Sequence, residues 1–149
     1  MNKFCCGFGH SDNYNINTEK LSELLYTIIH EHNVANFFIS DFGFFDQTFH
    51  SCVNNFKKTN SNIKLILVKP YNTKELSNNS EYYKYTYDEI IIPEFSANAY
   101  YKSAITIRNR WMIENSDFII SNVYRNFGGA YTAIKYAEKL EKNILYLPN

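Results

Sequence analysis

The segment that decides the fold is Phe118-Ile119-Ile120-Ser121-Asn122-Val123, which a short loop connects to Gly128-Gly129. The apolar run predicts a buried strand, because it is short, rich in isoleucine and bounded by polar residues. After the glycines, apolar residues recur at helical spacing up to Lys142, and we expect them to be buried: Ala133, Ile134, Ala137 and Leu140. A strand, a glycine turn and a helix in this order are typical of an α/β unit.

The same alternation covers the rest of the chain. Further strands are predicted at residues 4–6, 37–40, 64–68, 89–92 and 143–147. Further helices are predicted at residues 18–33, 45–58 and 98–115, the last burying Ala104, Ile105, Ile107, Trp111 and Met112. Residues 71–87 predict a loop with at most a short helix. Residues 1–149 therefore form one Rossmann-like α/β domain in three layers, with a mostly parallel sheet of five to six strands and helices on both faces.

Composition excludes several classes of protein. Fifteen basic and fifteen acidic residues give a net charge of +0, without the basic surface expected of a nucleic-acid-binding protein. Aromatic residues make up 17% of the chain, which is too many for a disordered one. No apolar stretch is long enough to span a bilayer, so we expect no membrane partner. The cysteines, Cys5, Cys6 and Cys52, form neither a disulfide framework nor a zinc site, and we expect a cytoplasmic protein with no metal and no cofactor.

Three loops follow predicted strands and should meet at one edge of the sheet, where open α/β sheets bind ligands. They cover residues 7–12, 40–43 and 123–129, and contain Gly7, Gly9, Gly43, Gly128 and Gly129. Glycine lets backbone amides approach an anion, and a helix N-terminus favours negative charge. Gly128-Gly129 is the best phosphate-binding candidate. The alternative is that the glycines only form tight turns, but the convergence of the loops favours ligand binding. Asp12 replaces the third glycine of the dinucleotide fingerprint, so NAD binding is not predicted.

Polar residues near these loops have two interpretations each. Arg108 could grip a phosphate or lie on a solvated helix face, and Arg110 must point elsewhere. His10 could contact a phosphate or ribose, or hydrogen-bond within its turn. Asp46 could reach a ribose hydroxyl or favour the helix dipole, and Asp117 could bind ligand or cap a turn.

The order of these motifs resembles the SLOG superfamily of Rossmann-like domains. The resemblance rests on Cys6-Gly7-Phe8-Gly9-His10, Gly43-Phe44-Phe45-Asp46, the segment 108–113, the segment 116–120 and Gly128-Gly129-Ala130. The superfamily includes the Lonely-guy phosphoribohydrolases and the Smf-type DNA-processing proteins. The chain is most similar to small bacterial members that carry an early Gly-His motif. The resemblance implies a nucleotide or nucleotide-derived ligand at the glycine loops, and a homodimer.

The resemblance is weaker in the catalytic half of the site. Lonely-guy enzymes carry Arg-Lys-x-x-Met on a helix, which Arg108 and Met112 match in part, but Trp111 replaces the helix carboxylate. The following glycine loop keeps Gly128, Gly129 and Thr132. It replaces the proline, the third glycine and the glutamate of the family by Phe127, Tyr131 and Ile134. Neither Trp nor Ile can act as a general acid or base, so the sequence does not decide whether the protein is an enzyme.

Three functions fit these observations. The first is a nucleotide-binding module that senses or carries its ligand. The second is a hydrolase that cleaves the N-glycosidic bond of a nucleoside monophosphate, for which Asp46 is a weak catalytic candidate. The third is a non-catalytic oligomeric scaffold. A tyrosine cluster could form a lid, a subunit interface or a half-buried surface, the last being favoured: Tyr71, Tyr82, Tyr83, Tyr85, Tyr87, Tyr100 and Tyr101.

Overall fold

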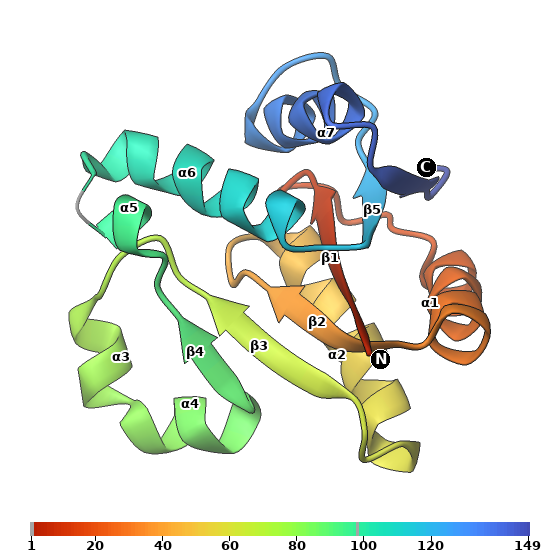
Figure 1. The fold of residues 1–149 in the computed structure, drawn as a ribbon, viewed down its shortest axis with the longest axis horizontal. Helices are drawn as coiled ribbons and strands as arrows, with labels where there is room; N and C mark the ends of the chain where they lie inside the picture. Colours follow the sequence, from red (N-terminus) through yellow and green to blue (C-terminus); the bar gives the residue numbers. More distant parts are fainter. Residues whose placement is uncertain (1, 98) are drawn as a thin grey trace.

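Parallel strands form the centre of the computed structural model, which describes residues 2–97 and 99–149 (Figure 1). Within these residues six strands form one sheet in the order β4-β3-β2-β1-β5-β6, and every pairing is parallel. The strands are β1 (Lys3–Gly9), β2 (Val34–Ile39), β3 (Lys64–Val68), β4 (Glu89–Ile91), β5 (Phe118–Asn122) and β6 (Asn143–Tyr146). The predicted α/β class with a parallel sheet is confirmed.

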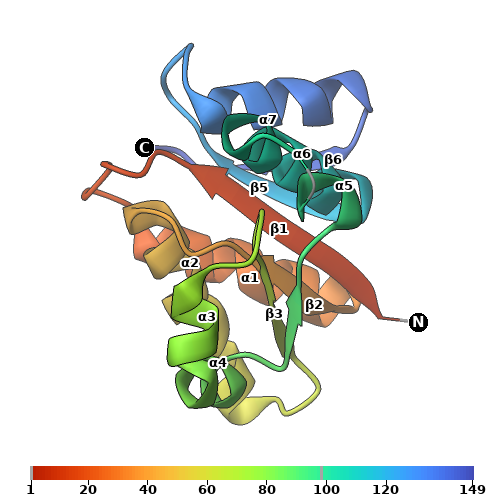
Figure 2. The same cartoon turned by 90° about the vertical axis from the view of Figure 1, so that its left-hand side faces the viewer.

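Helices cover both faces of the sheet (Figure 2). One face carries α1 (Thr18–His32), α2 (Phe44–Thr59), α3 (Lys74–Asn78) and α4 (Ser80–Thr86), and the other carries α6 (Tyr101–Glu114) and α7 (Gly129–Lys139). The short α5 (Glu94–Ala97) precedes α6. Alternate residues of β3 enter different cores, Leu65 and Leu67 on the α2 side and Ile66 and Val68 on the α6 side. This alternation explains why the central strands are apolar throughout.

The sequence placed several boundaries incorrectly. Strand β1 does not end near Cys6 but continues to Gly9, because residues 7–9 pair with residues 120–122 of β5. Residues 71–87 hold two short helices rather than at most one. The long helix begins at Tyr101, and residue 98, its predicted start, lies outside the described residues. Ile105 and Leu140, predicted to be buried, are exposed.

The order of the strands creates one switch point. The chain moves outward from β1 through β2 and β3 to β4, and then crosses back to place β5 on the other side of β1. Gly9 at the end of β1 pairs with Asn122 at the end of β5, so the loops that follow these strands leave the sheet together. Ligand sites of open α/β sheets lie at such a point.

Candidate ligand-binding site

A cavity of about 530 Å³ opens at the carboxyl edge of the sheet, beside the switch point. It is lined by the loops that follow β1, β2, β3 and β5 and by one face of α6. Of the residues predicted as ligand-binding, six line it: Gly9, His10, Asp46, Arg108, Gly128 and Gly129. The topology thus brings together residues that lie far apart in the sequence.

Helix α7 begins at the cavity with an open N-terminus. Gly128 caps the helix with φ +97°, a left-handed conformation that favours glycine, and no side chain caps the first turn. A Cβ built on Gly128 or on Gly129 would meet no atom within 4 Å. The first backbone amides of a helix have no acceptor within the helix, so those of α7 are available to an anion.

The other predicted glycines are packed against the protein itself. A Cβ on Gly43 would lie 2.3 Å from Cβ of Ser11, and one on Gly9 would lie 2.4 Å from the ring of Phe45. Gly7 lies 3.2 Å from the same ring by this measure. Gly7 and Gly43 do not line the cavity, so they belong to the packing of α2 rather than to the candidate site.

Arg108 reaches the cavity from the buried face of α6. It lies one helical turn from Ala104 and one from Met112, both buried, and is itself only 6% exposed. Its Nη1 donates to the carbonyl of Val68 at 2.9 Å, and its Nε donates to Oδ1 of Asn109 at 2.9 Å. Arg110 is exposed and lies 4.8 Å from the ring of Tyr136 on α7. Arg108 is therefore the arginine that enters the crevice, with its charge held near the end of β3.

Carboxylates line the wall of the cavity that is formed by the β2–α2 loop and the start of α2. Oδ2 of Asp46 accepts hydrogen bonds from Oγ of Ser40 at 2.6 Å and from the backbone amide of Phe42 at 3.0 Å. Burial raises the pKa of Asp46 to about 7, although these two bonds and the positive charge of Arg108 oppose the shift. Asp41 lies beside it and pairs with Nζ of Lys69 at 3.2 Å. Asp46 consequently exchanges its proton near neutral pH.

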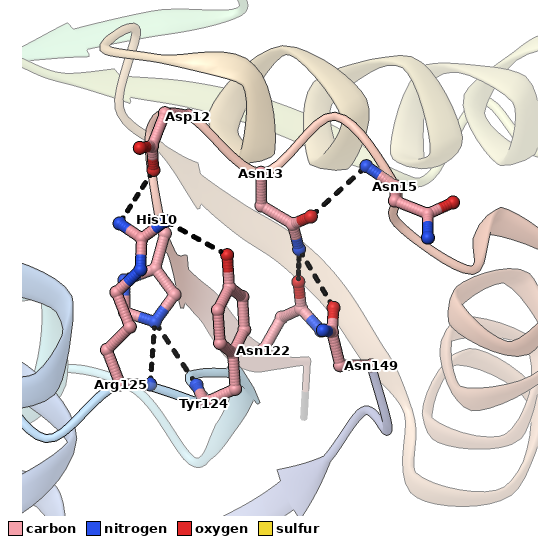
Figure 3. A network of polar contacts seen from close by, with 8 residues as sticks. All are labelled: His10, Asp12, Asn13, Asn15, Asn122, Tyr124, Arg125 and Asn149. Atoms are coloured by element: carbon pink, nitrogen blue, oxygen red, sulfur yellow. Dashed lines mark hydrogen bonds and ion pairs between the residues drawn. The ribbon is translucent and has the colours of Figure 1, made fainter.

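His10 is buried at the end of β1, with its ring turned toward the β5–α7 loop (residues 123–128). Its Nε2 accepts the backbone amides of Tyr124 at 3.1 Å and Arg125 at 3.2 Å (Figure 3). An Nε2 that accepts two amides carries no proton, so the imidazole is neutral with its proton on Nδ1. Burial is the main cause that lowers the pKa of His10. The imidazole thus bonds the β5–α7 loop and not its own turn, and its contact with a ligand stays a prediction.

Two cations of the cavity were not predicted. Nη1 of Arg125 pairs with Asp12 at 2.8 Å, and its guanidinium lies 5.2 Å from the ring of Tyr124 and 6.0 Å from that of Phe127. Lys69 is only 8% exposed and directly follows β3. Arg125 lies in the loop that the sequence singled out for Gly128-Gly129, and as the only cation of that loop it could have been found there.

Two further predicted residues, besides Gly7 and Gly43, lie outside the cavity. Asp117 precedes β5, at the end of the strand away from the cavity, where its Oδ2 accepts the backbone amide of Phe4 at 2.9 Å. This bond joins Asp117 to β1 rather than to its own turn, so it is not the predicted capping of a turn. Thr132 is exposed on the first turn of α7, and its hydroxyl donates to the carbonyl of Gly128 at 3.0 Å. Neither residue is part of the candidate site.

Comparisons with known proteins do not identify a family for this chain. No family model matches the chain, and no curated protein matches it. Among residues 2–97 and 99–149, no group of three or more His, Cys, Asp or Glu side chains could hold a metal ion. The described helices include none that is long and apolar enough to cross a membrane. Any assignment of function therefore depends on the chemistry of the cavity.

Proposed function

We propose that this protein binds a nucleotide or nucleotide-derived ligand at the carboxyl edge of its sheet, as a sensor or carrier module. The observation that carries the proposal is the open N-terminus of α7, which faces the cavity together with Arg108 and Arg125. The resemblance to the SLOG superfamily supports the same class of ligand. The cavity contains groups suited to the phosphate, the ribose and the base of a nucleotide.

The phosphate belongs at the α7 end. Free amides at a helix N-terminus point at a bound anion, and the helix dipole adds to the attraction. Arg125 lies in the adjoining loop. Its side chain is partly exposed and can move toward a ligand, and its ion pair with Asp12 keeps it nearby. A guanidinium binds phosphate oxygens in pairs, which fixes the orientation of the group.

The ribose belongs at the carboxylate wall. Asp46, Asp41 and Ser40 present acceptor oxygens, which sugar hydroxyls require as partners. Cations and carboxylates among the lining residues balance, with Lys69, Arg108 and Arg125 against Asp41, Asp46 and Glu75. A ligand that carries both an anion and hydroxyl groups uses both walls, whereas inorganic phosphate uses only one.

The base belongs at the mouth. The rings of Phe42 and Phe127 line the cavity and are 74% and 64% exposed. Exposed aromatic rings beside a phosphate site provide stacking surfaces for a base. The cavity volume, about 530 Å³, falls within the range of small-molecule sites.

A second function, hydrolysis of the N-glycosidic bond of a nucleoside monophosphate, is favoured by one observation. Asp46 has a pKa of about 7, the property of a carboxyl group that exchanges protons during catalysis at neutral pH. In this reaction water adds to C1′ of the ribose, and the base leaves with a proton. Release of free adenine from AMP by the wild type and not by Asp46→Asn supports it, and no release by the wild type excludes it.

Calorimetric titration with AMP, adenosine and ribose 5-phosphate tests binding. We expect AMP to bind more tightly than either fragment, and Arg125→Gln to weaken AMP binding about tenfold, since a charged hydrogen bond contributes about 1.5–3 kcal/mol. Arg110→Gln is the matched control, because Arg110 lies against Tyr136 and does not line the cavity. The proposal fails if AMP and a wider nucleotide panel neither bind nor raise the melting temperature.

A further inference from the structure

Side-chain hydrogen bonds and an ion pair join the loop that follows β1 to the loop that follows β5 (Figure 3). His10 accepts the amides of Tyr124 and Arg125, and Asp12 pairs with the guanidinium of Arg125. Nδ2 of Asn13 donates to Oδ1 of Asn122 at 2.9 Å, at the base of the same loop. Within the described part of the chain, Nε2 of His10 is the only acceptor that either amide has.

The β5–α7 loop connects these contacts to the N-terminus of α7, where we place the phosphate. Arg125 and Gly128 lie on the same short loop, and the free amides of α7 begin directly after it. A change in the position of residues 124 and 125 therefore moves both the guanidinium and the helix N-terminus. No atom surrounds Gly128 or Gly129 within 4 Å of a built Cβ, so the far end of the loop has little packing of its own.

We propose that His10 is a positioning residue: by accepting two amides of the β5–α7 loop, it holds Arg125 and the N-terminus of α7 in the arrangement that binds the anion. This inference rests on the proposed function, and it adds a regulatory property, since the contact exists only with a neutral imidazole. Protonation at Nε2 would set an N–H group against two other N–H groups.

The groups that surround His10 determine when this happens. Burial and the positive charge of Arg125 lower the pKa of His10, and Asp12 opposes them. The ring of Tyr124 packs edge-on against the imidazole, with centroids 4.5 Å apart. His10 is thus neutral at pH 7.5, and acidification opens the contact. Anion affinity attributable to His10 is present above its pKa and is lost as the pH falls through it.

Asp46 changes affinity in the opposite direction and must be separated from His10. Its protonation as the pH falls through about 7 removes a negative charge from the cavity, which favours an anionic ligand. The phosphate of AMP also gains a proton in this range. Both effects are common to the wild type and to His10→Gln. Glutamine offers Oε1 as an acceptor and does not titrate, so the ratio of the two affinities isolates His10.

The test is calorimetric titration of AMP at pH 7.5 and at one pH unit below the pKa of His10, which a nitrogen-15 titration of the imidazole measures. We expect His10→Gln to bind like the wild type at pH 7.5 and more tightly than the wild type at the lower pH, by up to about tenfold. His10→Ala should bind about tenfold more weakly at pH 7.5. His30→Gln, which removes an exposed imidazole on α1, is the control and should follow the wild type. A normal affinity of His10→Ala, or equal pH profiles of the wild type and His10→Gln, would overturn the inference.

A readout without ligand separates this inference from the proposed function. In the free protein, hydrogen exchange at pH 7.5 should be slow at the amides of Tyr124 and Arg125, and fast in His10→Ala. Nitrogen-15 chemical shifts of His10 should show a proton on Nδ1. Absence of AMP binding by every variant defeats the proposed function and this inference together. AMP binding with unprotected amides defeats this inference alone.

Discussion

Helices α2 and α7 begin with the same backbone turn, but different groups lie at their N-termini. Each follows a strand of the sheet, and each is capped by a glycine, Gly43 with φ +91° and ψ 175° and Gly128 with φ +97° and ψ 174°. At α2 the protein supplies its own partners: the amide of Phe44 donates to the carbonyl of Ser11 at 2.8 Å, and Asp46 places a carboxyl group in the first turn. At α7 no acidic residue lies in the first turn, and no side chain caps either helix.

A glycine before a helix does not by itself indicate a ligand site. Both glycines are required by their backbone conformation, but Gly43 is also required because Ser11 presses against it, whereas Gly128 faces open space. At the N-terminus of α2 the carbonyl of Ser11 accepts the first amide and a carboxyl group lies in the first turn, whereas the N-terminus of α7 is left for a partner from outside.

The largest effect is expected on stability. Gly43→Ala should lower the free energy of unfolding by about 4 kcal/mol, because backbone strain adds to the clash with Ser11. Gly128→Ala meets no neighbour and should cost only about 2 kcal/mol, from strain alone. Urea denaturation of both variants measures the difference. Equal losses would show that the two turns are not packed differently.

The next effect concerns the carboxyl group of α2. Because the pKa of Asp46 rises from its ordinary 3.8 to about 7 in the fold, the folded protein prefers the protonated form. Its contribution to stability is therefore fully present below about pH 4 and is lost as the pH rises through 7, by an amount on the order of 4 kcal/mol. Subtracting the unfolding free energy of Asp46→Asn at each pH isolates this slope. A difference that stays flat from pH 4 to 8 would contradict the buried, protonated carboxyl group.

The smallest effect is expected from a substitution that places a carboxylate in the first turn of α7. Tyr131 occupies the position in α7 that Asp46 occupies in α2, three residues after the capping glycine. Tyr131→Asp should stabilise the helix by about 0.3–1 kcal/mol relative to Tyr131→Asn, which loses the same ring without gaining a charge. It should also weaken AMP binding about tenfold more than the asparagine variant does, by repulsion at the phosphate. If both variants bind AMP equally, the phosphate does not lie at α7.

The periodicity of apolar residues was sufficient to predict the architecture. It failed at glycine positions and in segments without an apolar stripe. Strand β1 was predicted too short because Gly7 and Gly9 are unfavourable in strands, and only the structure shows that Phe45 occupies the space beside them. Residues 71–87 carry no clear apolar stripe, so their two short helices escaped prediction. Arg108 could be expected in the crevice, since it lies on the apolar stripe of α6 between Ala104 and Met112.

The remaining site features depend on tertiary contacts that no local pattern encodes. Gly43 and Gly128 look alike in the sequence, and only the position of Ser11 distinguishes them. The sequence favours neither a ligand nor its own turn as the partner of His10, and it cannot indicate the observed partners, because Tyr124 and Arg125 lie more than a hundred residues away. The fold was thus predictable from spacing, whereas the separation of structural from binding residues was not.

The most direct test of the central claim is a nuclear magnetic resonance titration of the backbone amides with AMP. We expect the resonances of Gly129 and Ala130 in α7 to shift and saturate, while those of Phe45 and Asp46 at the start of α2 respond far less. AMP binding that leaves the α7 amides unchanged, or that shifts the α2 amides instead, would contradict the account.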